Sequence, residues 1–183
     1  MIVRHKNAGF SLIEIMVTVV ILMVGLLGLA GLQGRALTAQ MESYQRSQAL
    51  ILLRDMADRI SANRGFADSY VGNLDMTACP DLVAGSSVAT DRNEWCNALL
   101  GAAETSTGGT NVGAMIGARG CITKTSPTPS GLTGQYVVQV AWQGLNSTAA
   151  PPASLACGAG QYGTDESKRR VIALPVNVGC LTC

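Results

Sequence analysis

The sequence predicts an α+β fold: one long N-terminal helix packed on a small antiparallel sheet of about three strands, with a loop-rich, disulfide-bonded head. Three observations predict it. A long segment without proline begins near Ser11, strand-like alternation appears only in the last third of the chain, and all six cysteines lie beyond residue 64. With 183 residues, the chain is long enough for one domain and a long helix.

The first half of the helix is expected from an apolar run that one acid interrupts. Basic residues Arg4 and Lys6 precede Gly9, and Glu14 is the only charged residue within 10–34. The run is about as long as a helix that crosses a bilayer, whereas an unpaired acid in hydrocarbon costs a few kcal/mol or more. The basic leader predicts that the N-terminus lies in the cytoplasm and the later part of the chain outside it. We therefore expect residues 10–34 to enter a membrane and Glu14 to find a partner there.

Residues 9–14 read G-F-S-L-I-E, which resembles the G-F-[ST]-L-x-E processing site of type IV pilins and pseudopilins. The resemblance implies a pilin-like fold. It implies that prepilin peptidase cuts between Gly9 and Phe10, removing residues 1–9 as a leader, and that it N-methylates Phe10. It also implies that Glu14 docks the subunit by neutralising the N-terminal ammonium of Phe10 on an adjacent subunit.

The run from Val24 to Gln33 further resembles the PilV group of minor pilins. This narrower resemblance implies a non-enzymatic minor pilin that takes part in pilus assembly or priming and in tip adhesion. It would be held in the inner membrane by one helix, with its head in the periplasm, and would then enter an extracellular pilus. Its expected partners are prepilin peptidase, other major and minor pilins and the pilus assembly platform. Neither a cofactor nor a small-molecule substrate is expected.

Several alternatives stay open. A type II secretion pseudopilin and a major pilin share the processing motif. An ordinary secretory signal peptide would be cut near Ala36, and a simple signal anchor would keep its leader. Nucleic acid is an unlikely partner because the net charge is only +1. The single histidine, His5, lies in the expected leader, so the processed chain would have no histidine chemistry.

The second half of the helix, residues 35–64, is expected to be amphipathic and to end before Gly65. It contains neither proline nor glycine up to Asn63. Its stripe should be buried under the head, and opposite charges four residues apart should pair on its flanks. The stripe comprises Leu37, Met41, Tyr44, Gln48, Leu52, Met56 and Ile60, and the pairs are Glu42–Arg46, Arg54–Asp58 and Asp55–Arg59.

Four glycines recur every third residue at the end of the apolar run. Small residues let membrane helices approach closely, and each glycine also lowers helix propensity by about 1 kcal/mol relative to alanine. These four glycines, the glycine strip, therefore either form a packing face in a weakened part of the helix or are simply tolerated in a membrane helix. Its members are Gly25, Gly28, Gly31 and Gly34.

The head, residues 65–183, is expected to begin with loops up to residue 118. A short helix should run from Asp91 to about Ala103, with Asp91 and Glu94 as a capping box.

Strands are expected at residues 120–124, 136–142 and 169–178, and Pro175 should mark the last one as an edge strand or as bulged there. Arg169 and Arg170 should point to opposite faces of that strand as solvated edge charges.

An even number of cysteines in an exported domain predicts disulfides. Cys79–Cys96 is the favoured pair because it closes a loop that runs into the short helix. The other four should tie the strands and the C-terminal end together. No metal site is expected because the first four cysteines lack the two close pairs typical of zinc sites. A periplasmic thiol-disulfide protein using the C-x-x-C at the end of the chain is the remaining alternative. The six candidates are Cys79, Cys96, Cys121, Cys157, Cys180 and Cys183.

Overall fold

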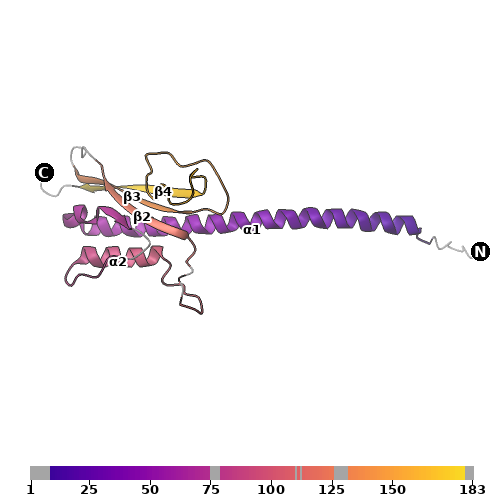
Figure 1. Cartoon of the computed structure of the whole chain (residues 1–183), viewed down its shortest axis with the longest axis horizontal. Helices are drawn as coiled ribbons and strands as arrows, with labels where there is room; N and C mark the ends of the chain where they lie inside the picture. The colour runs from indigo at the N-terminus through magenta and orange to yellow at the C-terminus, as the bar shows by residue number, and fades with distance from the viewer. Residues whose placement is uncertain (1–8, 75–78, 110, 112, 126–131, 180–183) are drawn as a thin grey trace, which may run out of the picture. The chain divides into compact units, whose positions relative to one another are not determined.

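The computed structural model describes residues 9–74, 79–109, 111, 113–125 and 132–179. It divides into two compact units, Met1–Met41 and Glu42–Cys183. Helix α1 (Leu12–Ala62) supplies the described helix of the first unit and continues into the second. The second unit also contains all four strands and the two shorter helices (Figure 1).

In the first unit, α1 begins directly after Ser11. The carbonyl of Ser11 accepts hydrogen bonds from the backbone N–H groups of Glu14 and Ile15. Every described residue from Gly9 to Leu37 is exposed. By length and composition α1 could cross a membrane, although a signal sequence would pass the same test.

In the second unit, the buried face of α1 differs from the predicted stripe. Met56 and Ile60 are fully buried as expected, but Tyr44 is 48 % exposed while its neighbour Gln45 is buried. Leu37 and Met41, both in the first unit, are exposed as well. The prediction was wrong for the middle of the stripe, where Gln45, Ala49 and Leu53 are buried in place of Tyr44, Gln48 and Leu52. The buried residues of α1 are Gln45, Ala49, Leu53, Met56, Ala57 and Ile60.

The predicted ion pairs on α1 also form only in part. Arg59 binds Asp55 at 3.1 Å. Glu42 instead accepts hydrogen bonds from the backbone of Asn146 at 3.0 Å and from Arg170 at 3.5 Å. A head residue far along the chain thus takes the place of the local partner Arg46.

The sheet is antiparallel with strand order β1-β2-β3-β4. This confirms the α+β fold, and the short β1 adds a strand to the three expected. Pro175 lies on β4, at the edge of the sheet, where a residue without a backbone N–H is tolerated. The strands are β1 (Gly72–Leu74), β2 (Ile116–Lys124), β3 (Leu132–Gln143) and β4 (Arg169–Gly179).

The alternation predicted on β3 separates two buried clusters. Val138, Val140 and Trp142 join the main core with residues of α1. On the other face, Ala141 packs in a smaller cluster with Tyr162 and the half-cystines Cys121 and Cys157. We call the first the core face and the second the outer face of the sheet.

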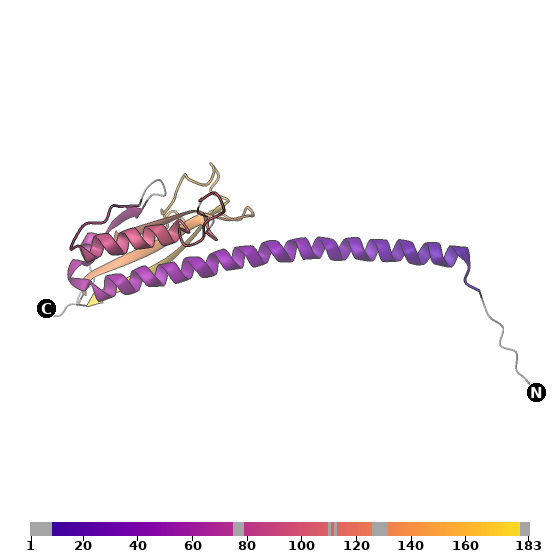
Figure 2. The ribbon, with the colours of Figure 1, turned by 90° about the horizontal axis from the view of Figure 1, so that it is seen from below.

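The described residues between Arg64 and Leu99 contain more regular structure than the expected loop. A 3-10 helix, η1 (Arg64–Tyr70), follows α1, and helix α2 (Ser87–Leu99) begins one turn earlier than predicted. Ser86 caps α2 by accepting a hydrogen bond from the N–H of Ala89 at 3.2 Å. In the second unit, α1 and α2 run side by side on the same side of the sheet (Figure 2).

Trp95 of α2 joins both helices to the sheet. Its side chain is fully buried, and its indole Nε1 donates to the carbonyl of Leu52 on α1 at 2.8 Å. A Cβ at Gly120 of β2 would lie 2.4 Å from a ring carbon of Trp95 and 2.8 Å from Leu99. Glycine is therefore required at position 120 because the indole occupies the space of a side chain.

We predict that Gly120→Ala destabilises the head by about 1–3 kcal/mol, because the indole must move or leave its rotamer. The matched control is Gly65→Ala, where a Cβ would meet no atom within 4 Å. That variant should stay within about 0.5 kcal/mol of the parent. Denaturant unfolding followed by tryptophan fluorescence measures the head, since Trp95 and Trp142 are both buried there. Equal stability of the two variants would contradict the packing argument.

Candidate functional site

The expected processing site lies just before the first turn of α1. Gly9 and Phe10 precede the helix, and the Phe10 side chain is 82 % exposed. A peptidase needs an extended, accessible backbone at the bond that it cuts. The described structure thus leaves the Gly9–Phe10 bond outside regular secondary structure.

Glu14 lies in the first turn of α1, and its side chain is exposed. A carboxylate is favoured at this end of a helix because the helix dipole is positive there. Within the described residues, Glu14 forms no ion pair. Gly9, Phe10 and Glu14 therefore lie together at the beginning of the helix, and the carboxylate remains accessible to another molecule.

A polar network in the head was missed from the sequence. Arg59 of α1 binds Asp91 at 2.8 Å and Glu94 at 2.7 Å, both on α2. The prediction that Asp91 and Glu94 form a capping box is therefore wrong, because α2 begins at Ser87 and both acids lie inside it. No local pattern marks this pairing, since it joins residues more than thirty positions apart.

The network continues into η1. The Tyr70 hydroxyl donates to Asp91 and accepts a hydrogen bond from Asn63 at 3.0 Å. Burial raises the pKa of Tyr70 to about 12, and the hydrogen bond to Asp91 acts in the same direction. Burial lowers the pKa of Arg59, but its hydrogen bonds to Glu94, Asp91 and Asp55 outweigh this and raise it overall.

A second polar contact fixes η1 to the sheet. Asp68 accepts a hydrogen bond from the Tyr136 hydroxyl at 2.7 Å and pairs with Lys124 at 2.6 Å. The hydrogen bond from Lys124, and then that from Tyr136, lowers the pKa of Asp68. Burial, aided by Asp68, raises the pKa of Tyr136 to about 12.

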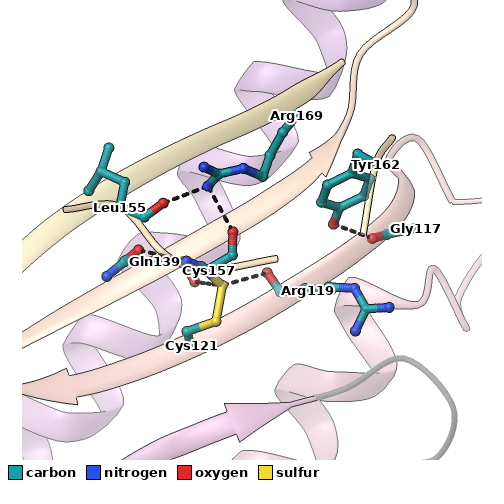
Figure 3. Close-up of a disulfide and its surroundings, with 8 residues drawn as sticks. All are labelled: Gly117, Arg119, Cys121, Gln139, Leu155, Cys157, Tyr162 and Arg169. Atoms are coloured by element: carbon teal, nitrogen blue, oxygen red, sulfur yellow. Dashed lines mark hydrogen bonds between the residues drawn. A yellow bond between two sulfur atoms is a disulfide. The ribbon is translucent and has the colours of Figure 1, made fainter. Parts of the chain in front are cut away.

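On the outer face, a disulfide joins Cys121 of β2 to Cys157 in the loop before β4 (Figure 3). Arg169 holds the same loop, because its guanidinium donates to the carbonyls of Leu155 and Cys157 and pairs with Glu166. The side chain of Arg169 is only 4 % exposed. The prediction of solvated edge charges is therefore wrong: Arg169 holds the loop, and Arg170 contacts Glu42 of α1.

The other described cysteines pair as the sequence favoured, since Cys79 forms a disulfide with Cys96 of α2. No free cysteine is found among the residues that the structure describes. Cys180 and Cys183 lie outside those residues, and so does the proposed C-x-x-C site. Across the described ranges, no group of three or more histidine, cysteine, aspartate or glutamate side chains could hold a metal ion.

Two family models match consecutive parts of the chain. Residues 4–30 match the prokaryotic N-terminal methylation motif, and residues 31–100 match the family described as Type IV pilin Tt1218. These matches support a type IV pilin. Searches of curated proteins and of solved structures found no match.

A type IV pilin is a structural subunit that prepilin peptidase processes and that assembles into pili. The apolar first half of α1 is consistent with membrane anchoring of such a subunit. The two matches cover α1, η1, β1 and α2, whereas strands β2, β3 and β4 lie beyond them.

We predict that Tyr70→Phe makes the free energy of unfolding of the head fall less steeply as the pH rises above 10. Tyrosine ionises near pH 10 in the unfolded chain and, for Tyr70, near pH 12 in the folded one. The stability from keeping Tyr70 neutral is thus complete below pH 10 and is lost as the pH rises through 12. The Tyr70→Phe variant cannot lose this stability at high pH. At pH 7, however, its free energy of unfolding is lower by about 1–2 kcal/mol because Asp91 and Asn63 each lose a hydrogen-bond partner.

Denaturant unfolding at pH values from 7 to about 12 measures both effects. The matched control is Tyr44→Phe, because Tyr44 is exposed on α1. It should match the parent at every pH. If the free energy of unfolding of Tyr70→Phe fell with pH as steeply as that of the parent, Tyr70 would not govern the loss of stability at alkaline pH.

Proposed function

We propose that this pilin is a minor pilin of the PilV type, cut after Gly9, methylated at Phe10 and built into a type IV pilus. One observation carries the proposal. The methylation-motif match over residues 4–30 coincides with an exposed Gly9–Phe10 bond and with a single exposed acid in the first turn of an apolar helix.

In this proposal, Glu14 docks the subunit onto its neighbour. Cleavage creates an ammonium group on Phe10, and Glu14 of an adjacent subunit neutralises it. Opposite charges attract strongly at low dielectric, whereas a single charge there is heavily penalised. Docking therefore removes the cost of holding Glu14 in the membrane, and this favours assembly over the isolated subunit.

The proposed location follows the subunit from the inner membrane, with its head in the periplasm, to an extracellular pilus. The disulfides Cys79–Cys96 and Cys121–Cys157 support an oxidising compartment for the head. The proposed partners are prepilin peptidase, other major and minor pilins and the assembly platform.

The glycine strip lies in the run from Val24 to Gln33, whose resemblance to the PilV group supports this assignment. A Cβ at Gly28 or Gly31 would meet no atom of this chain within 4 Å. The fold of the chain itself does not require glycine there. In this proposal the glycines let other helices approach closely or let the helix stretch on assembly, and the alternative is that glycine is simply tolerated there.

We predict that intact mass and N-terminal sequencing of the membrane form give a chain that starts at N-methylated Phe10. Replacing Gly9 with valine should abolish cleavage, because the peptidase must approach the backbone closely. The matched control is Gly65→Ala, which leaves the motif intact. A chain that starts near Leu37 would instead identify a secreted domain with an ordinary signal peptide.

We predict that Glu14→Gln leaves cleavage intact but lowers incorporation into pili at least about tenfold, because the Phe10 ammonium would be left unpaired in a low-dielectric environment. Quantitative immunoblotting of sheared pili against the membrane fraction measures incorporation. The matched control, Glu14→Asp, keeps the charge and should retain more incorporation than Glu14→Gln. Normal incorporation of the glutamine variant would refute the docking role.

A further inference from the structure

In the second unit, a polar contact holds the beginning of α1 against the rest of the head. Glu42, the first residue of this unit, accepts hydrogen bonds through Oε1 from the backbone N–H of Asn146 at 3.0 Å and from Arg170 at 3.5 Å. The Arg170 guanidinium also donates to the carbonyls of Asn146 at 2.6 Å and Ser167 at 3.0 Å. This contact, the clasp (Glu42, Asn146 and Arg170), joins α1 to the segment after β3 and to the first residues of β4.

The fold leaves a defined place for Arg170 in the clasp. A Cβ at Gly144 would lie 2.6 Å from Cζ of Arg170 and 2.8 Å from its Nε, so glycine makes room for the guanidinium. The side chain of Arg170 is 17 % exposed and that of Glu42 is 29 % exposed. Solvent and salt screen a partly buried pair less than a fully exposed one. The clasp is thus a preformed contact that favours the docked position of α1.

One turn further along α1, a buried polar atom opposes this docking. Gln45 is the first buried residue of the helix and is only 2 % exposed. Its Oε1 accepts no hydrogen bond from any residue that the structure describes. A buried acceptor without a partner has lost its hydrogen bonds to water, and this loss destabilises the buried state. Release of this turn from the head would return the Oε1 of Gln45 to water.

The packing beside this turn is incomplete. A pocket of about 190 Å³ is lined by Gln48 and Leu52 of α1 and by Met115, which precedes β2. Side chains that border a pocket have fewer neighbouring atoms than those in a closed core, and so gain less dispersion energy. The helix at residues 45–48 is therefore held less firmly by packing than the part that follows it.

The next turns of α1 are fixed by contacts with α2. Trp95 donates to the carbonyl of Leu52 at 2.8 Å, and Arg59 pairs with two acids of α2. Any release of α1 must therefore stop before Leu52. It would free residues 42–48, which at 1.5 Å per residue amount to about 10 Å of helix.

We propose that residues 42–48 of α1 exchange between a docked state, which the clasp holds, and a released state, in which Gln45 reaches water. A hydrogen bond to a charged group and a buried unpaired acceptor contribute free energies of similar size and opposite sign, so both states are accessible. Release lengthens the part of α1 that can contact another molecule by about 10 Å, while the sheet and α2 stay folded. The exchange does not depend on cleavage after Gly9. Its failure is therefore distinguishable from failure of the proposed pilin function, which N-terminal sequencing tests.

The test is backbone amide hydrogen exchange, followed by NMR, in the ¹⁵N-labelled full chain in detergent micelles. Glu42→Ala removes the acceptor of the clasp and places a good helix former on α1. We expect it to speed exchange at Gln45 and Ala49 at least about tenfold, because it favours the released state. Exchange at Val140 in β3 should stay as in the parent, since release leaves the sheet folded. The matched control is Asp58→Ala, which removes an exposed acid of the same helix and should change neither rate.

A second variant should act in the opposite direction. Gln45→Met keeps the approximate shape of the side chain and removes the unpaired acceptor, so exchange at Ala49 should slow at least about threefold. Added salt should speed exchange at Ala49 in the parent but not in Glu42→Ala, because it screens the clasp. Equal exchange in Glu42→Ala and Asp58→Ala, or faster exchange in Gln45→Met than in the parent, would overturn the proposal. Loss of protection at Val140 in Glu42→Ala would also overturn it, because the whole head would then open.

Discussion

The insertion of Trp95 between α1 and β2 is the contact on which the second unit depends. Its indole donates to the carbonyl of Leu52 and lies over Gly120, so one side chain sets the spacing of two helices and a strand. Arg59 lies two turns beyond Leu52, and Asp91 lies one turn before Trp95. The indole contact and the Arg59–Asp91 ion pair therefore require the two helices to run antiparallel.

The outer face of the sheet is organised by a different constraint, the closure of one loop. Arg169 donates to the carbonyls of the half-buried Leu155 and the buried Cys157, and so satisfies both acceptors. Because the loop is also bonded to β2 through Cys121, it covers the β3 residues that alternation places away from the core. The sheet therefore has the main core on one face and a smaller buried cluster, covered by the loop, on the other.

Local patterns predicted the elements, but contacts between distant residues decided their roles. Alternation at 136–142 located β3, and the run from Arg169 located β4. Arg169 and Asp91 were misread because their partners are set by the fold and not by neighbours in the chain. The buried face of α1 was misplaced by one residue at positions 44–53, because the sheet and α2 decide which side of the helix is covered. The smaller cluster on the outer face had no sequence signal, because strand register and a disulfide assemble it.

The two units differ in what covers their apolar side chains, and their proposed functions follow from this difference. The head buries apolar side chains in two clusters of its own, whereas the apolar side chains of α1 from Leu12 to Leu32 are exposed and need another molecule to cover them. Lipid can cover those side chains, but it cannot neutralise Glu14. A neighbouring subunit that offers both an apolar helix and an ammonium group satisfies both requirements at once. In the proposed pathway, this difference makes the membrane a temporary environment for α1 and the filament the more favourable one.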